Sequence, residues 1–195
     1  LSRRALNGAA LGRERLLARA AAVPLELIEQ LLGLQAQAPN PPYLGLWTRL
    51  ERFELPQLTA LLESGAVVRA ASLRSTLHLW SARDYLAWRA TLGPMMARRS
   101  HASWGRTLGG AAPAAITRAG LVFFAKEALT AKALGEALAP RFPGAPPQGL
   151  ASTVRDHAPL IQLPPAGTFD HHQQPRLRPA RQHLGQAPKP EKPIN

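Results

Sequence analysis

The chain has 195 residues, of which 46% are hydrophobic, and this is enough apolar material to bury the core of one large domain or two small ones. It contains no cysteine, which excludes disulfides and thiolate metal sites. No stretch approaches the roughly 20 apolar residues of a membrane span, and no signal peptide is visible. We therefore expect a cytoplasmic protein that makes no contact with membranes.

The formal net charge of +12 comes mainly from arginine. Guanidinium groups match phosphate geometry, and a basic surface gains affinity by releasing counterions from nucleic acid. The charge therefore favours a nucleic-acid partner, with association to the nucleoid when DNA is bound. An arginine-rich composition typical of a GC-rich genome is the alternative explanation.

Four helices are predicted in the first third of the chain. Apolar residues recur at helical spacing over 2–12, 24–33, 40–50 and 55–64. Pro24 suits a first helical turn, and Gly33 and Gly65 suit helix ends. Asn40 is expected to cap the third of these helices.

Residues 66–80 have the alternating, β-branched pattern of a hairpin, with a polar tip over 72–75. Ser81 and Asp84 then have the spacing of a capping box at the start of a helix over 81–93. Helices followed by a hairpin are the order of a winged helix, that is, a helix-turn-helix with a β wing.

The second half repeats this order of elements. Helices are predicted over 112–129, over 130–142 with Thr130 as cap, and over 144–158, before a second hairpin within 159–180. The expected fold is mainly α with short β hairpins, arranged as two tandem winged-helix modules. The modules are placed at 1–92, which includes a glutamine motif, and at 93–185, and the proline- and lysine-rich tail 186–195 is predicted to be disordered.

The glutamine motif lies in the stretch "LQAQAPNPPYLGLW", where Gln35 and Gln37 flank Ala36. Gly33 ends the preceding helix, and Pro39 disfavours helix in the residue before it. The segment is therefore expected to be extended, which would direct both amides to one side. Such amides can orient a water molecule. The alternative is that they satisfy the free carbonyls of the preceding helix and the adjacent loop backbone.

The stretches "LGLQAQAPNPPYLGLWTRL" and "VVRAASLRSTLHLWSARDY" together resemble the winged-helix DNA glycosylases of the azinomycin-resistance, interstrand-crosslink-repair type. That family carries a glutamine–apolar–glutamine motif, matched by residues 35–37, and tends to show "RGTLH" where this chain has "RSTLH". The later "LPPAGTFDHHQQPRLRPA" resembles its second wing. Known members are nearly twice as long and have a third winged-helix module, so we expect a fragment, a truncated paralogue or a binding-only derivative.

The resemblance implies a monofunctional glycosylase, without metal or cofactor, in which Gln35 and Gln37 are catalytic. Its substrates would be cationic alkylated purines, including crosslinked ones, in duplex DNA. A cationic purine leaves as a neutral base, so positioning and electrostatics can supply much of the acceleration. The rival is a non-catalytic DNA-binding or regulatory protein. A protein–protein scaffold is a third option, which the arginine excess argues against. The sequence does not indicate the oligomeric state.

The residues expected to contact phosphates or DNA grooves are Arg49, Arg69, Arg74, His78, Arg106, Arg176 and Arg178. For His78, a structural hydrogen bond is the alternative. His171 and His172 are adjacent, and a metal site would need further ligands. Tyr43 and Trp104 could stack on a base, although such residues more often belong to a core.

Overall fold

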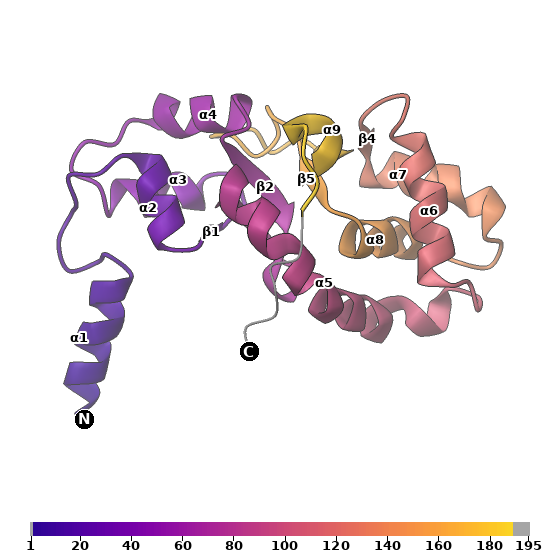
Figure 1. The fold of residues 1–195 in the computed structure, drawn as a ribbon, viewed down its shortest axis with the longest axis horizontal. Helices are drawn as coiled ribbons and strands as arrows, with labels where there is room; N and C mark the ends of the chain where they lie inside the picture. Colours follow the sequence, from indigo (N-terminus) through magenta and orange to yellow (C-terminus); the bar gives the residue numbers. More distant parts are fainter. Residues whose placement is uncertain (1, 189–195) are drawn as a thin grey trace.

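The structure is a computed structural model, and it describes residues 2–188. The described chain is mainly helical, with one small antiparallel sheet (Figure 1). Its α-helices are α1 (Arg3–Arg13), α2 (Pro24–Gln30), α3 (Pro41–Trp47), α4 (Leu55–Glu63), α5 (Ala82–Trp104), α6 (Pro113–Phe123), α7 (Ala131–Leu138), α8 (Pro147–His157) and α9 (Ala180–Leu184). Its strands are β1 (Leu34–Gln35), β2 (Val67–Ala71), β3 (Leu77–Ser81), β4 (Leu129–Thr130), β5 (Leu160–Gln162) and β6 (Arg176–Pro179). Single 3-10 turns are η1 (Leu73–Ser75), η2 (Gly105–Thr107) and η3 (Ala139–Arg141).

All six strands belong to one sheet in the order β1-β3-β2-β5-β6-β4, with antiparallel neighbours throughout. The predicted hairpins are β2–β3 and β5–β6. They are not separate, because β2 pairs with β5 through Arg69 opposite Gln162 and Ala70 opposite Ile161. The two halves of the chain therefore meet along the centre of a shared sheet.

The order helix, short strand, two helices and two strands occurs twice. We call residues 24–81 (α2, β1, α3, α4, β2, β3) the first unit and residues 113–179 (α6, β4, α7, α8, β5, β6) the second unit. In each unit the short strand pairs with the last strand, β1 with β3 and β4 with β6. These two-residue strands were not predicted from the sequence, because two residues carry no periodic signal.

Each unit has its own apolar core, and a third cluster lies under α5. The first unit buries, among others, Leu27, Ile28, Tyr43, Leu46, Leu58 and Leu79. The second unit buries, among others, Ile116, Leu134, Leu138, Leu150 and Val154. The third cluster comprises Val68, Ala70, Trp80, Tyr85, Ile161 and Ala180. Because Val68, Ala70 and Ile161 come from β2 and β5, this third cluster holds the two units together at the point where their strands pair.

The helix starts follow the predicted capping pattern, with one exception. The Ser81 side chain accepts a hydrogen bond from the Asp84 N–H at 3.1 Å, and the Thr130 side chain accepts one from the Ala133 N–H at 3.1 Å. Asn40 occupies the N-cap position of α3, as predicted, but its side chain makes no capping hydrogen bond. Its amide instead bonds Asp170, donating to the carboxylate at 2.7 Å and accepting from the backbone N–H at 2.8 Å.

Two helix lengths differ from the prediction. The helix expected over 81–93 continues through Pro94 to Trp104, so the predicted module boundary after residue 92 falls inside the continuous helix α5. The helix expected over 112–129 ends at Phe123, because Leu129 leaves it to pair with Leu177 in the sheet. A long-range strand pairing thus overrides the local helical pattern.

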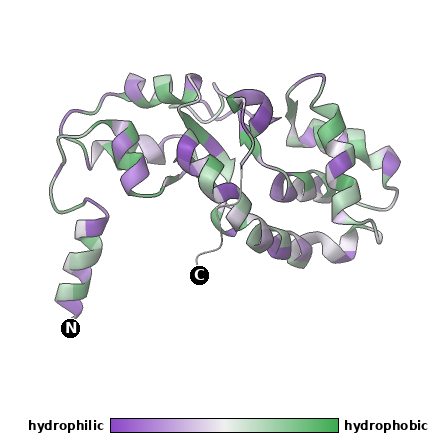
Figure 2. Cartoon of the chain, viewed as in Figure 1, coloured by the Kyte–Doolittle hydropathy of each residue, from purple (hydrophilic) through white to green (hydrophobic). Residues whose placement is uncertain are grey.

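The first helix, α1, projects from the rest of the molecule (Figure 1), and none of its residues is buried. Figure 2 shows hydrophobic and hydrophilic residues alternating along it. Among residues 2–188, no helix combines the length and hydrophobicity that crossing a membrane requires. Most of the tail predicted to be disordered, residues 189–195, lies outside the described residues.

Candidate functional site

A sharp turn leads from α2 into the glutamine motif. Gly33 has a φ of +101°, in the left-handed region that favours glycine. A Cβ at this position would lie 2.6 Å from the backbone oxygen of Leu79, so a side chain would also clash. The turn places the motif directly beside β3, as the edge strand of the sheet.

The motif itself is extended, as predicted. Leu34 and Gln35 pair with β3, and the Ala36 N–H donates to the Leu77 carbonyl at 2.8 Å. Ala36 is 1% exposed, whereas Gln35 and Gln37 on either side are exposed. This alternation follows from the two-residue period of an extended chain.

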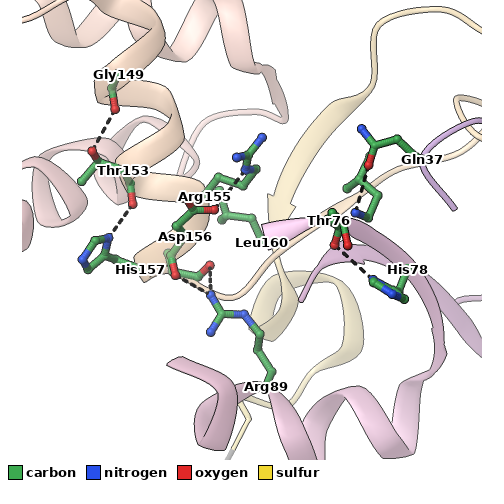
Figure 3. Close-up of polar contacts among 12 residues, drawn as sticks. Gln37, Thr76, His78, Arg89, Gly149, Thr153, Arg155, Asp156, His157 and Leu160 are labelled. Atoms are coloured by element: carbon green, nitrogen blue, oxygen red, sulfur yellow. Dashed lines mark hydrogen bonds and ion pairs between the residues drawn. The ribbon is translucent and has the colours of Figure 1, made fainter. Parts of the chain in front are cut away.

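Gln37 lies just beyond the end of β1 and is held at both its side chain and its backbone. Its Oε1 accepts a hydrogen bond from the Leu77 N–H at 3.3 Å (Figure 3). Its backbone carbonyl accepts one from the Arg69 guanidinium at 3.2 Å. The amide nitrogen has no partner among the residues that the structure describes, so both of its N–H donors are free to bind a ligand.

Gln35 occupies a different position. It is opposite His78 in the β1–β3 pairing, and opposed residues of an antiparallel pair project to the same face. Gln37 lines a cavity of about 350 Å³, and Gln35 is not among the lining residues. The two glutamines are therefore both exposed beside the buried Ala36, and only Gln37 lines this cavity.

The cavity is built from both units. It lies between the end of the glutamine motif, the β2–β5 pairing and the loop that joins β5 to β6. Its lining residues are Gln37, Ala38, Pro39, Arg69, Leu77, Gln162, Gly167, His171, His172, Gln173, Gln174 and Pro175. None of them is acidic. The bonds between Asn40 and Asp170 fix the loop against the start of α3, and with it this wall of the cavity.

Arg69 forms the floor of the cavity and is only 6% exposed. Its Nε donates to the Ala36 carbonyl at 3.0 Å, a terminal nitrogen donates to the Gln37 carbonyl at 3.2 Å, and the other donates to Gln162 Oε1. Burial lowers the pKa of Arg69. The sequence placed Arg69 among exposed DNA contacts, but β2 is buried along its whole length, so a ligand can reach this side chain only through the cavity.

His78 is half-buried within a polar cluster. Its Nδ1 lies 3.1 Å from Ser72 Oγ and 3.2 Å from the Thr76 carbonyl (Figure 3), and Ser72 Oγ also accepts from Trp80 Nε1 at 3.0 Å. Burial lowers the pKa of His78, the hydrogen bond with the Thr76 carbonyl partly offsets this, and the charge of Arg74 lowers the pKa further. The geometry favours the structural alternative over a DNA contact.

The remaining predicted arginines fall into two groups. Arg74 is exposed at the tip of the β2–β3 hairpin, where its φ is +53°, and Arg106 is exposed in η2. Arg178 is half-buried on β6. Arg74 and Arg106 are thus accessible as predicted phosphate contacts.

Arg49 and Arg176 are engaged within the protein. The Arg49 side chain is 13% exposed and donates to the Glu14 carbonyl at 2.7 Å, which ties the segment after α1 to α3. Arg176 donates to the Ala128 carbonyl at 2.8 Å and pairs with the Glu127 carboxylate at 2.7 Å. Any contact of these arginines with DNA would compete with these bonds.

The aromatic candidates are structural by position, whereas His171 and His172 are exposed and line the cavity. Tyr43 is fully buried, with its ring 5.4 Å from that of Phe169, and Trp104 packs against the core of the second unit. Both suit the core alternative better than base stacking. Residues 2–188 contain no group of three His, Cys, Asp or Glu side chains placed to hold a metal ion.

The family model for AlkZ-like DNA glycosylases matches residues 28–194. The chain belongs to this AlkZ-like family. A solved structure, the Streptomyces sahachiroi DNA glycosylase AlkZ, has the same fold, with a TM-score of 0.73 at 16% sequence identity over 99% of this chain and 53% of that chain. The chain thus spans about half the length of that solved relative. No curated protein sequence matches it.

The AlkZ-like match includes every residue that lines the cavity and leaves out α1. It begins within α2 and covers all six strands of the sheet. Sequence reasoning missed Gln162 and Gly167 as parts of this site. Neither carries a local signal, because the β2–β5 pairing brings Gln162 to Arg69 and the loop after β5 brings Gly167 there.

Proposed function

We propose that this AlkZ-like chain acts in DNA repair as a monofunctional DNA glycosylase, hydrolysing the N-glycosidic bond of cationic alkylated purines in duplex DNA. The observation that carries the proposal is the setting of Gln37. In a chain of a glycosylase family, an exposed side-chain amide lines a cavity, accepts the Leu77 N–H and keeps its amino group free, while the Arg69 guanidinium holds the backbone carbonyl of the same residue.

The chemistry requires little of the protein. A purine alkylated on a ring nitrogen is positively charged, so it leaves as a neutral base when the electron pair of the glycosidic bond passes to it. Water attacks the anomeric carbon and loses a proton to solvent. Gln37 contributes by orienting that water through the second lone pair of Oε1 or through its free amino group.

We further propose that both units are winged helices, with the β2–β3 and β5–β6 hairpins as wings. The pairing of β1 with β3 and of β4 with β6 supports this assignment, since each unit then has three helices and a three-stranded sheet in the same order. Wings and helices of this kind dock on DNA grooves and backbone. Arg74, Arg106, Arg176 and Arg178 are the proposed phosphate contacts.

A non-catalytic DNA-binding function is the second candidate, and one observation favours it. Gln37 Oε1 already accepts the Leu77 N–H, and Gln35 does not line the cavity that Gln37 lines. In that case the motif would support the wing and would not act on a lesion.

Release of free base separates the two functions. The substrate is a duplex with a single cationic N7-methylguanine, and a sample without protein measures spontaneous loss. Gln37→Ala is compared with Gln182→Ala, which removes an exposed glutamine of α9. The glycosylase function is supported if the parent protein releases base above background and only Gln37→Ala suppresses this release. Duplex binding without base release supports the second candidate. A duplex with an alkylated interstrand crosslink tests whether the protein also unhooks crosslinks.

A further inference from the structure

Arg69 carries a buried charge that no acidic group of the described chain neutralises. It is 6% exposed, and its three hydrogen bonds go to the neutral oxygens of Ala36, Gln37 and Gln162. A guanidinium has five N–H donors, so two have no partner among residues 2–188. Buried charges are normally paired, because an unpaired one costs several kcal/mol of solvation.

From this setting we infer that the cavity holds a backbone phosphodiester group of bound DNA, contacted by the Arg69 guanidinium. The inference rests on the proposed DNA binding by this chain and is independent of base hydrolysis. A phosphodiester supplies the missing negative charge, and its oxygens accept charge-assisted bonds from guanidinium N–H groups.

The walls of the cavity suit an anion. Gln37, Gln162, His171 and His172 can each donate a hydrogen bond, and no carboxylate lines the cavity. Its volume of about 350 Å³ is many times the roughly 30 Å³ that one water molecule occupies. The space is therefore sufficient for a phosphate with part of its sugar.

The loop backbone at Gly167 packs closely against the Arg69 side chain. The φ of Gly167 is +87°, and a Cβ there would lie 2.7 Å from Arg69 Cδ, so the loop backbone lies directly against the arginine stem. The Ala36 and Gln37 carbonyls and Gln162 use three of the N–H donors, and because Arg69 lines the cavity, the inference assigns the remaining two to a ligand there.

The position of this phosphate would fix the DNA strand relative to the glutamine motif. Arg69 and Gln162 are opposite one another where β2 of the first unit meets β5 of the second. Gln37 lines the same cavity, so a phosphate bound by Arg69 would place the attached sugar beside the Gln37 amide. The site would therefore set which nucleotide faces Gln37, and it would do so only when both units are in place.

The isosteric substitution Gln162→Glu tests the inference without removing the buried arginine. The new carboxylate would pair with Arg69 at the existing contact, so the fold is kept. The protein's own side chain would then take the place of an external anion. Gln182→Glu makes the same charge change at an exposed glutamine of α9. The probes are undamaged duplexes of one sequence in which single phosphates are replaced, one at a time, by neutral methylphosphonates.

For the unsubstituted protein we expect one phosphate position whose neutralisation lowers duplex affinity by about tenfold, the effect of losing one charge-assisted bond. Gln162→Glu should lower affinity for the normal duplex by a similar factor, abolish the effect of that one methylphosphonate, and leave the melting temperature unchanged or higher. Gln182→Glu should leave the methylphosphonate profile unchanged.

The inference would be overturned if Gln162→Glu and Gln182→Glu lost equal amounts of duplex affinity. It would also be overturned if Gln162→Glu left the methylphosphonate profile unchanged. Inorganic phosphate could also shift the NMR signals of cavity residues while the methylphosphonate profile stays independent of Gln162→Glu. The cavity would then bind free anions only, and the inference would again be overturned. Failure of base release would reject only the proposed hydrolysis, because every measurement here is of binding.

Discussion

Gln37 has two tasks in the proposed mechanism. Its Oε1 holds the Leu77 N–H at the end of the β1–β3 pairing, and the rest of the amide faces the cavity. Removing the side chain therefore leaves one strand N–H without its partner, which costs about 1 kcal/mol of stability where the group is shielded from water. Activity and stability must be measured together to separate the two tasks.

Alanine at Gln37 is expected to slow release of N7-methylguanine on the order of a hundredfold, the cost of one oriented group in a dry site. Duplex affinity should stay nearly unchanged, because phosphates dominate it. Gln35→Ala should also slow release, and the double variant should be little worse than the poorer single variant if both act on one water. Single-turnover release and fluorescence anisotropy measure the two quantities.

Gln37→Asp is expected to keep or raise the release rate. A carboxylate can orient the same water, and it also stabilises the cationic sugar that develops in the transition state. Loss of duplex binding in the alanine variants with unchanged turnover would instead make the motif a docking feature. The measured melting temperatures serve as the control for a purely structural role.

Arg74 is the clearest surface contact to test. It is exposed at the tip of the β2–β3 hairpin, and within the described chain its guanidinium makes no salt bridge. Arg74→Ala should weaken binding to all duplex sequences alike, because phosphate contacts carry no sequence information. The melting temperature should change little. Arg118→Ala, an exposed arginine of α6, is the matched control, and an equal loss there would show that only net charge matters.

At the scale of elements, α5 connects the units through a buried arginine. Arg89 is 4% exposed and donates to the Asp156 and Ala158 carbonyls at 3.0 and 3.1 Å, at the end of α8 (Figure 3). The Asp156 carbonyl is one of those that a helix end leaves unpaired, whereas the Ala158 carbonyl also accepts the Leu160 N–H at 2.9 Å. The guanidinium therefore caps α8 from a helix that also packs on β2 and β3.

Arg89→Leu should lower the free energy of unfolding by about 3 kcal/mol, because two buried carbonyls lose a charged donor. Urea unfolding measures the change. Arg98→Ala, an exposed arginine of the same helix, should stay within about 0.5 kcal/mol of the parent. An Arg89 variant as stable as the parent would mean that water replaces the guanidinium and that α5 does not hold α8.

Local signals in the sequence predicted most helices and both hairpins, because apolar periodicity, prolines in first turns and capping residues act within a few positions. The parts that failed depend on long-range pairing. Leu129 leaves a helical pattern to join Leu177, and α5 runs through the predicted boundary. The candidate site shows the same contrast between local and long-range features. The extended glutamine motif was predicted, whereas the burial of Arg69 and the place of Gln162 in the cavity were not.

At the scale of the whole molecule, the shared sheet makes the two units one framework. The β2–β5 pairing lies in the middle of the strand order, and the third apolar cluster covers it. Arg69 and Gln162 lie in this central pairing, so the cavity exists only when the units are joined. The proposed catalysis at Gln37 and the proposed placement of the DNA strand are therefore expected to depend on the integrity of the sheet.

The net charge of +12 makes a prediction for the whole chain. If arginines supply most of the affinity, the logarithm of duplex affinity should fall linearly with the logarithm of salt concentration, with a slope of about 0.9 per phosphate neutralised. Several exposed arginines on both units should give a slope well above one. Titrations in monovalent salt at constant pH measure it.

Two variants divide this slope into its parts. Arg74→Ala should reduce it by about one, because a single phosphate contact is lost at the wing. Gln162→Glu should reduce it by a similar amount if the cavity takes a phosphodiester, although this substitution leaves every arginine in place. A salt response that is flat in the parent protein would remove DNA as the main partner. A steep slope that neither variant changes would place the phosphate contacts elsewhere, and the exposed arginines of α1 and α5 would then be the next to substitute.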